Sequence, residues 1–441
     1  LATDISDILF GTPGPVQSVA NLGVLKDDEV NIIVHGHEPT LSEMIVVASL
    51  DPELIEYAKS QGANGINLAG LCCTSIEVLM RHGIPPAGNY LSQELAIITG
   101  SVEAMIVDVQ CIMQSLGELT QDYHTELITT SPKGKIPGAI HIEFGEHEAL
   151  STAKKIVRRA IDNFPDRGKM DIPAVKEGLV AGFSHEYLNY MQGGELRGSF
   201  RPLNDAIISG RIRGAAGVVG CSNAQVTHDD ATSNIIRELI ANDVLVVVTG
   251  CAAHAAAKYR YLSPEMMEKA GSGLKEVCET IGVPPVLHLG SCVDNSRILT
   301  VLTQMATEGG LGEDIDDLPA VGICPEWMSE KAISIGTYCV ASGAYVLFGV
   351  GSPVSASEEV TQIISAGWES KVGGKLEFYE DWRDIVAKSL EHIDKKRAAL
   401  KLAEYKPDRF GASGDWRIGE LEALPLEEKI GAVYGLPVAA P

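Results

Sequence analysis

The sequence is poor in positive charge. Lys and Arg total 35 against 59 Asp and Glu, which gives a formal net charge of −24 over 441 residues. This balance excludes a nucleic-acid binder or an anionic-membrane binder, because the long-range field would repel phosphate groups. It is compatible with a small neutral or gaseous substrate, and equally with a charge that serves only solubility.

Several familiar patterns are absent. No stretch of about 18 apolar residues is free of charges or glycine clusters, so we expect no transmembrane helix. The opening LATDISDILF lacks a basic region and an initiator Met, so we expect no secretory signal and a cytoplasmic protein. The cysteines include no C-x-x-C pair, which argues against a zinc ribbon and ferredoxin-type spacing. No G-x-G-x-x-G follows a predicted strand, so a nucleotide-binding site is disfavoured.

Short β-branched runs alternate with longer helical segments along most of the chain. The predicted strands cover residues 30–38, 62–70, 101–111, 125–131, 138–145, 214–221, 244–251, 284–292, 344–351 and 373–382. Alternation of this kind is typical of parallel sheets covered by helices on both faces. We therefore predict an α/β fold with two doubly wound (Rossmann-like) parallel-sheet domains, over residues 28–176 and 177–441. The segment 1–27 stands apart from them.

Cysteines and histidines recur where predicted strands end. Ligands of open α/β sheets bind at the carboxyl ends of the strands, so donors at these positions are expected to converge between the two domains. They are His35, His37, Cys72, Cys73, Cys111, Cys221, Cys251 and Cys292. Each single cysteine has a simpler interpretation, because free cysteines are often buried as small hydrophobic residues. That interpretation applies to Cys278 and Cys339, which lie in predicted helices, while Cys324 follows a strand.

Many thiolates with one imidazole indicate a soft or borderline metal, such as an iron–sulfur cluster, nickel or Cu(I). Lys331, in PEWMSEKAISIG, follows a strand and opens a predicted helix, so its ammonium is within reach of the same crevice. The alternative for Lys331 is an exposed helix lysine. One turn later, Ile335 lies on the same predicted helix.

Eight motifs occur together in order. They are VHGHEP, LCCTSIEVLMRHGIP, NYLSQE, DVQCIM, GVVGCSN, TGCAAHA, GSCVDNSR and PEWMSEKA. The combination resembles the anaerobic nickel-containing carbon monoxide dehydrogenases, relatives of the hybrid-cluster proteins, from about Ser6 to about Gly374. The resemblance implies two domains packed around a [Ni-4Fe-4S] cluster with one histidine and five cysteine ligands. Carried over motif by motif, the ligands are His37, Cys73, Cys111, Cys221, Cys251 and Cys292.

The resemblance also implies roles for these residues. His37 and Cys73 would hold an iron outside the cubane, and Cys292 would bind nickel. Spacing favours Cys73 over its neighbour Cys72, which is interpreted as a reserve ligand. Lys331 would stabilise negative charge on the substrate, and Ile335 would form an apolar wall.

The implied reaction is the interconversion of CO and water with CO₂, two protons and two electrons. The expected partners are a second copy of the chain in a homodimer, a ferredoxin-like electron carrier and an acetyl-CoA synthase subunit. In the family, an N-terminal helical region carries additional [4Fe-4S] clusters; segment 1–27 is interpreted as the remnant of that region.

Two alternatives remain. One is a hybrid-cluster-type hydroxylamine reductase, which would contain no nickel. The other is a non-catalytic metal-binding or docking subunit, which would hold metal but transfer no electrons from CO.

Overall fold

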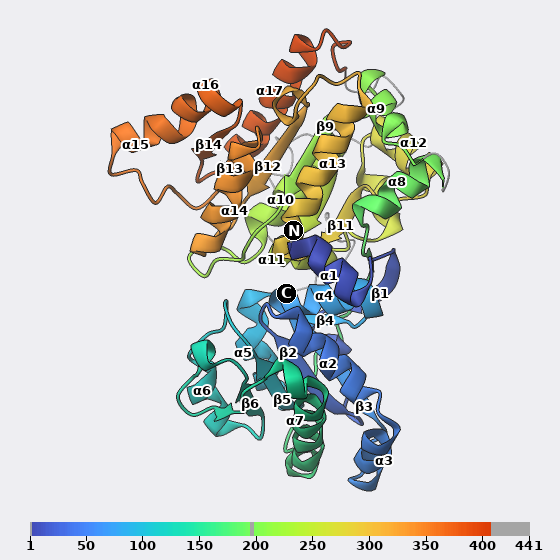
Figure 1. Cartoon of the computed structure of the whole chain (residues 1–441), viewed down its shortest axis with the longest axis vertical. Coiled ribbons are helices and arrows are strands. Elements are labelled where there is room, and N and C mark those ends of the chain that lie inside the picture. Colours follow the sequence, from blue (N-terminus) through green and yellow to red (C-terminus); the bar gives the residue numbers. More distant parts are fainter. Residues whose placement is uncertain (1, 195–197, 407–441) are drawn as a thin grey trace, which may run out of the picture.

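The computed structural model describes residues 2–194 and 198–406. Two six-stranded parallel sheets dominate this part of the chain, together with a small two-stranded sheet. The predicted α/β fold with two parallel sheets is therefore confirmed. Figure 1 shows each large sheet in its own lobe, with α1 (Ala2–Phe10), α4 (Cys72–His82) and α11 (Gly250–Lys258) at the junction. The end of the predicted second domain, residues 407–441, lies outside the described residues.

The first lobe is built on the strand order β4-β3-β2-β5-β6-β7. Counted along the chain within this sheet, the order is 3-2-1-4-5-6, as in doubly wound nucleotide-binding folds. The strands are β2 (Val30–His35), β3 (Ile66–Leu71), β4 (Pro86–Gly88), β5 (Val102–Val107), β6 (Glu126–Thr129) and β7 (Ile140–His141). Helices α2 (Pro39–Ser49), α3 (Pro52–Ser60), α4, α5 (Gln93–Ile98), α6 (Leu116–Leu119) and α7 (Ala149–Asn163) connect and cover them.

The second lobe repeats the same order with β11-β10-β9-β12-β13-β14. Its strands are β9 (Gly214–Val218), β10 (Val244–Thr249), β11 (Val286–Gly290), β12 (Ala320–Cys324), β13 (Tyr345–Phe348) and β14 (Lys375–Phe378). Its helices are α8 (His185–Gly193), α9 (Arg201–Ile208), α10 (Asp230–Ala241), α11, α12 (Ser272–Ile281), α13 (Asn295–Glu308), α14 (Glu330–Ala341), α15 (Glu358–Gln362), α16 (Trp368–Val372) and α17 (Trp382–Ala399). The valine run of β10 is buried because helices cover both faces of the sheet.

The small sheet pairs β1 (Val16–Ala20) antiparallel with β8 (Glu177–Ala181). Neither strand was predicted from the sequence. β1 lies in the segment 1–27 and β8 at the start of the predicted second domain, so this sheet ties the beginning of the chain to the second lobe. The domain limits 27/28 and 176/177 stay a prediction.

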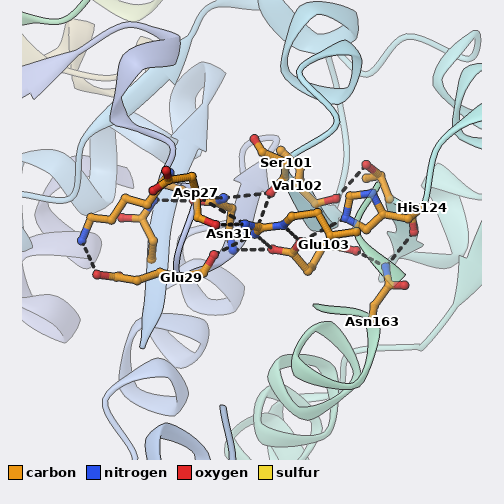
Figure 2. A network of polar contacts seen from close by, with 12 residues as sticks. Asp27, Glu29, Asn31, Ser101, Val102, Glu103, His124 and Asn163 are labelled. Atoms are coloured by element: carbon orange, nitrogen blue, oxygen red, sulfur yellow. Dashed lines mark hydrogen bonds and ion pairs between the residues drawn. The ribbon is translucent and has the colours of Figure 1, made fainter. Parts of the chain in front are cut away.

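A buried ionic network holds the amino-terminal edge of the first sheet (Figure 2). Glu103, near the start of β5, is fully buried and pairs with Arg167 Nη2 at 2.6 Å and with His124 Nε2 at 3.0 Å. It also accepts a hydrogen bond of 2.6 Å from the backbone N–H of Asn31 in β2. A buried carboxylate is tolerated only when it is paired in this way. The network therefore fixes the amino-terminal edge of the sheet, which lies opposite to the carboxyl ends of its strands.

One predicted strand was too long. The prediction for residues 101–111 ended at Cys111, whereas β5 ends at Val107. Gln110 and Cys111 have φ values of 63° and 54°, which lie in the left-handed region and cannot continue a strand. Cys111 therefore belongs to a loop beyond the sheet.

Candidate metal centre

The carboxyl ends of the two sheets meet at the junction of the lobes, and the predicted donors follow those ends. His37 follows β2, Cys111 follows β5, and Cys72 and Cys73 open α4 directly after β3. From the second lobe, Cys221 lies in the loop after β9, Cys251 opens α11 directly after β10, and Cys292 opens a short 3-10 turn after β11. In both sheets the strand order reverses between the first and fourth strands, which is where doubly wound folds bind ligands. Each lobe thus contributes part of one donor set.

Direct contacts join the donor loops across the junction. The backbone N–H of Cys292 points at Cys73 Sγ, 3.5 Å away. A Cβ built at Gly250, the residue before Cys251, would lie 2.7 Å from Cys292 Sγ. Only glycine at position 250 therefore allows the start of α11 and the turn at Cys292 to approach this closely. The N–H of Ala252 donates to the carbonyl of Gly220 at 3.2 Å. This hydrogen bond holds the Cys221 loop next to the start of α11.

The thiols are free and shielded from solvent. Cys73, Cys221, Cys251 and Cys292 are between 4% and 7% exposed, and the structure records no disulfide at any of them. Cys72 and Cys111 both have a positive φ. Non-glycine residues in this conformation are strained and concentrate at functional sites.

His37 is oriented by its backbone and by one ring nitrogen. Its Nδ1 lies 3.2 Å from the carbonyl oxygen of Val109, and its ring makes hydrogen bonds with the thiols of Cys73 and Cys111. Burial lowers the pKa of His37, but the Cys73 thiolate and these hydrogen bonds outweigh burial and raise it to about 10. Imidazole and thiolates are therefore immediate neighbours.

Asp108 fixes the loop that carries His37, and the sequence analysis missed it. Its buried carboxylate accepts hydrogen bonds from the backbone N–H groups of His37 at 2.7 Å and Glu38 at 2.8 Å. Gly36 has φ of 129°, and a Cβ there would lie 1.7 Å from Asp108 Oδ1. The available signal was position, since Asp108 directly follows β5, where functional side chains of such sheets lie.

The adjacent cysteines have different neighbours. A hydrogen bond with Cys292 holds the pKa of Cys73 well below its usual value, and the pKa of Cys292 is raised in return. Cys72 instead pairs with Cys251, which raises the pKa of Cys72 and lowers that of Cys251. Cys73 thus lies between His37 and Cys292, and Cys72 lies next to Cys251; the choice of Cys73 as the ligand stays a prediction.

Lys331, at the start of α14, extends into the same crevice. Its Nζ is buried and has no hydrogen-bond partner among the described residues. Burial alone would lower the pKa of Lys331. The nearby thiolates of Cys73 and Cys292 raise it by more than burial lowers it, so the ammonium stays charged. A buried ammonium without a hydrogen-bond partner is costly, and the neighbouring thiolates of Cys73 and Cys292 offset part of that cost.

An apolar cavity in the second lobe reaches this crevice. Cys221, Cys292 and Lys331 lie on its wall, and so does the half-buried Ile335. Most of the remaining lining is aliphatic, from β9 to β12 and from α13. The cavity therefore suits a small uncharged molecule.

The residues that meet at the junction offer sulfur and imidazole donors. Within residues 2–194 and 198–406, no three His, Cys, Asp or Glu side chains have the arrangement that would hold one metal ion. A cluster distributes its protein ligands over several metals, and thiolates with one imidazole are the donors of iron–sulfur and nickel chemistry. The buried thiols, His37 and the unpartnered ammonium together meet this requirement.

The other cysteines and His35 lie elsewhere or behind the donors. Cys278 is buried in α12 and Cys339 half-buried in α14, in the predicted helices. Cys324, at the end of β12, packs beside Gly220 and Cys221. His35 is buried at the end of β2, where burial lowers its pKa to about 4.

Comparisons with known proteins agree with this geometry. A family profile described as the Prismane/CO dehydrogenase family matches residues 1–383. The chain is 53% identical over 404 residues to carbon monoxide dehydrogenase 1 of Methanosarcina mazei, covering 91% of this chain and 63% of the relative. The chain therefore spans about 63% of the length of this relative and of carbon monoxide dehydrogenase 1 of Methanosarcina acetivorans.

Solved structures show the same likeness. A nickel-free carbon monoxide dehydrogenase from Thermococcus sp. AM4 superimposes with a TM-score of 0.88 at 50% identity, covering 91% of this chain and 63% of that one. An acetyl-CoA synthase/carbon monoxide dehydrogenase with NiZn[Fe4S4] and NiNi[Fe4S4] clusters in its alpha subunits gives 0.86 at 41% identity, covering 92% and 63%. In the part of the chain that the structure describes, no helix is long and apolar enough to cross a membrane.

Proposed function

Because the chain belongs to the Prismane/CO dehydrogenase family, we propose that it interconverts CO and water with CO₂, two protons and two electrons. The observation that carries the proposal is the crevice between the lobes. It brings His37, the buried cysteine thiols and the unpartnered Lys331 ammonium together beside an apolar cavity.

The proposed cofactor is a [Ni-4Fe-4S] cluster held from both lobes. Its ligands would be His37, Cys73, Cys111, Cys221, Cys251 and Cys292. His37 and Cys73 would hold the iron outside the cubane, and Cys292 would hold nickel. When bound, the cluster supplies an open position for CO, a metal that acidifies water, and storage for two electrons.

The protein side chains would perform the remaining tasks. The Lys331 ammonium would stand against the oxygen atom that gains negative charge as water oxygen adds to the carbon of CO. A preorganised cation in a dry site stabilises such charge strongly. Ile335 and the aliphatic cavity wall would exclude water and admit small uncharged gases. Asp108 would hold the His37 loop at fixed geometry through its two backbone hydrogen bonds.

The partners follow from the same proposal. The two electrons would leave to a ferredoxin-like carrier through additional [4Fe-4S] clusters, and the enzyme would act as a homodimer. An acetyl-CoA synthase subunit is a further candidate partner, because a relative from Moorella thermoacetica is named carbon monoxide dehydrogenase/acetyl-CoA synthase subunit beta.

The test is metal analysis with a CO assay on protein purified without oxygen. We expect nickel and iron in the preparation and CO-dependent reduction of a viologen dye. Iron without nickel, together with hydroxylamine reduction, would establish the hybrid-cluster alternative. Metal-loaded protein that reduces no dye with CO would establish a non-catalytic metal-binding or docking subunit.

A further inference from the structure

Behind the contact between Cys73 and Cys292, six side chains form a closed ring of polar contacts. Asp7, Glu77, Arg81, Asp294 and Arg297 supply ionisable groups, each with its side chain at most 8% exposed, and Ser291 completes the ring. They come from α1, from α4, from the turn between β11 and α13, and, for Arg297, from the first turn of α13. In Figure 1 these elements meet at the waist of the molecule.

The first half of the ring crosses from one lobe to the other. The hydroxyl of Ser291 donates a short hydrogen bond to Glu77. On α4, the other oxygen of Glu77 accepts from Arg81 Nη1 at 2.5 Å. Arg81 Nη2 in turn pairs with Asp7 of α1 at 2.8 Å.

The second half returns to Ser291. Asp7 also pairs with Arg297 Nη2 at 2.6 Å, and Arg297 Nε pairs with Asp294 at 3.1 Å. Asp294 then accepts the backbone N–H of Ser291 at 2.7 Å. The preceding Gly290 has φ of 138°, and a Cβ there would lie 2.2 Å from Asp294 Oδ2. The turn is therefore shaped around this carboxylate.

The ring is attached to two of the donors. Glu77 lies four residues, about one helical turn, after Cys73 on α4, and Ser291 immediately precedes Cys292. The hydrogen bond between Glu77 and Ser291 therefore spans the lobes beside the 3.5 Å contact between Cys292 N and Cys73 Sγ. Any movement of α4 relative to α13 that changes one contact changes the other.

We propose that this ring is the positioning device that sets the spacing of Cys73 and Cys292 across the junction of the lobes. The proposal rests on the proposed function, because it assumes that these two cysteines hold neighbouring metals. Ser291 and Asp7 are its positioning residues. Groups that orient metal ligands typically change metal affinity by about 10- to 100-fold when they are removed.

The test compares two isosteric variants that each remove one buried charge. Asp7→Asn weakens the ring, and Glu103→Gln weakens the network of Figure 2 at the far edge of the first sheet. Nickel and iron per protein, and the denaturant midpoint of unfolding, are measured for both variants and for the parent. We expect both variants to lower the midpoint. Only Asp7→Asn should weaken nickel binding, by about 10-fold or more.

A second variant covers the case in which Asp7→Asn does not fold. Ser291→Ala retains all ionisable members of the ring and removes only its hydroxyl link to Glu77. Loss of nickel in Ser291→Ala, with iron largely retained, supports the ring as a positioning device. If Asp7→Asn or Ser291→Ala folds and binds nickel as tightly as the parent does, the proposal is overturned. If the parent itself binds no nickel, the proposed function fails instead, so the two failures are distinguishable.

Discussion

The charge balance of the ring predicts an unusual pH dependence of stability. The ring contains three carboxyl groups, those of Asp7, Glu77 and Asp294, but only two guanidinium groups, those of Arg81 and Arg297. Burial and the nearby charge of Asp294 raise the pKa of Glu77 from 4.5 to about 8. Glu77 is therefore protonated in the folded protein at neutral pH, which leaves two carboxylates facing two guanidiniums.

The sign follows from proton linkage. Between pH 4.5 and about 8 the unfolded chain has lost the Glu77 proton while the folded protein retains it, so stability falls as the pH rises. This interval spans about 3.5 pH units, and each unit is worth about 1.36 kcal/mol. The free energy of unfolding that Glu77 contributes therefore decreases by up to about 5 kcal/mol across the interval.

Glu77→Gln isolates this contribution, because glutamine resembles the neutral acid in shape and does not titrate. We expect Glu77→Gln and the parent to have similar free energies of unfolding near pH 5. As the pH rises to 9, the variant should become the more stable protein by a few kcal/mol. Denaturant titrations monitored by circular dichroism at several pH values give the comparison. Parallel pH profiles for the two proteins would refute a neutral Glu77.

Three further predictions concern the site and the first lobe. Lys331→Ala should lower kcat for CO oxidation by about 100- to 1,000-fold while nickel and iron content, measured by elemental analysis, stay at parental values; parental kcat contradicts the assigned role. Asp108→Asn should reduce metal affinity by about 10-fold or more, because it weakens both hydrogen bonds that hold the His37 loop; unchanged metal titrations would show that the loop holds itself. Arg167→Ala should cost about 3–5 kcal/mol of unfolding free energy by leaving Glu103 buried without its guanidinium partner, and a change below 1 kcal/mol in chemical denaturation would contradict that role.

The strand pattern could be predicted because buried parallel strands are nearly continuous apolar runs. The prediction for 244–251 captured β10, which covers Val244–Thr249. The three-residue β4 and the pair of β1 and β8 were missed, since strands so short or so exposed carry little periodicity. β7 was predicted over 138–145 and forms only at Ile140–His141, because an edge strand is ordered by a single neighbour.

The donors could be predicted from one rule, that ligands bind at the carboxyl ends of parallel strands. That rule brings His37 and the cysteines to one edge of each sheet without any knowledge of how the sheets face one another. The ring could not be predicted, because the contact between Glu77 and Ser291 joins residues 214 positions apart on different lobes. Such contacts depend on docking of the lobes, which local sequence does not encode.

The division of the donors between two similar lobes has a thermodynamic consequence. The first lobe supplies His37, Cys73 and Cys111, and the second supplies Cys221, Cys251 and Cys292, so neither half-set alone could complete the proposed cluster. A group that binds only the docked arrangement stabilises that arrangement by its own binding free energy. If these residues hold the proposed cluster, docking of the lobes and metal loading form one linked equilibrium, on which the ring behind Cys73 and Cys292 would act. In this proposal, the ring presents the two cysteines at a fixed separation before any metal is bound.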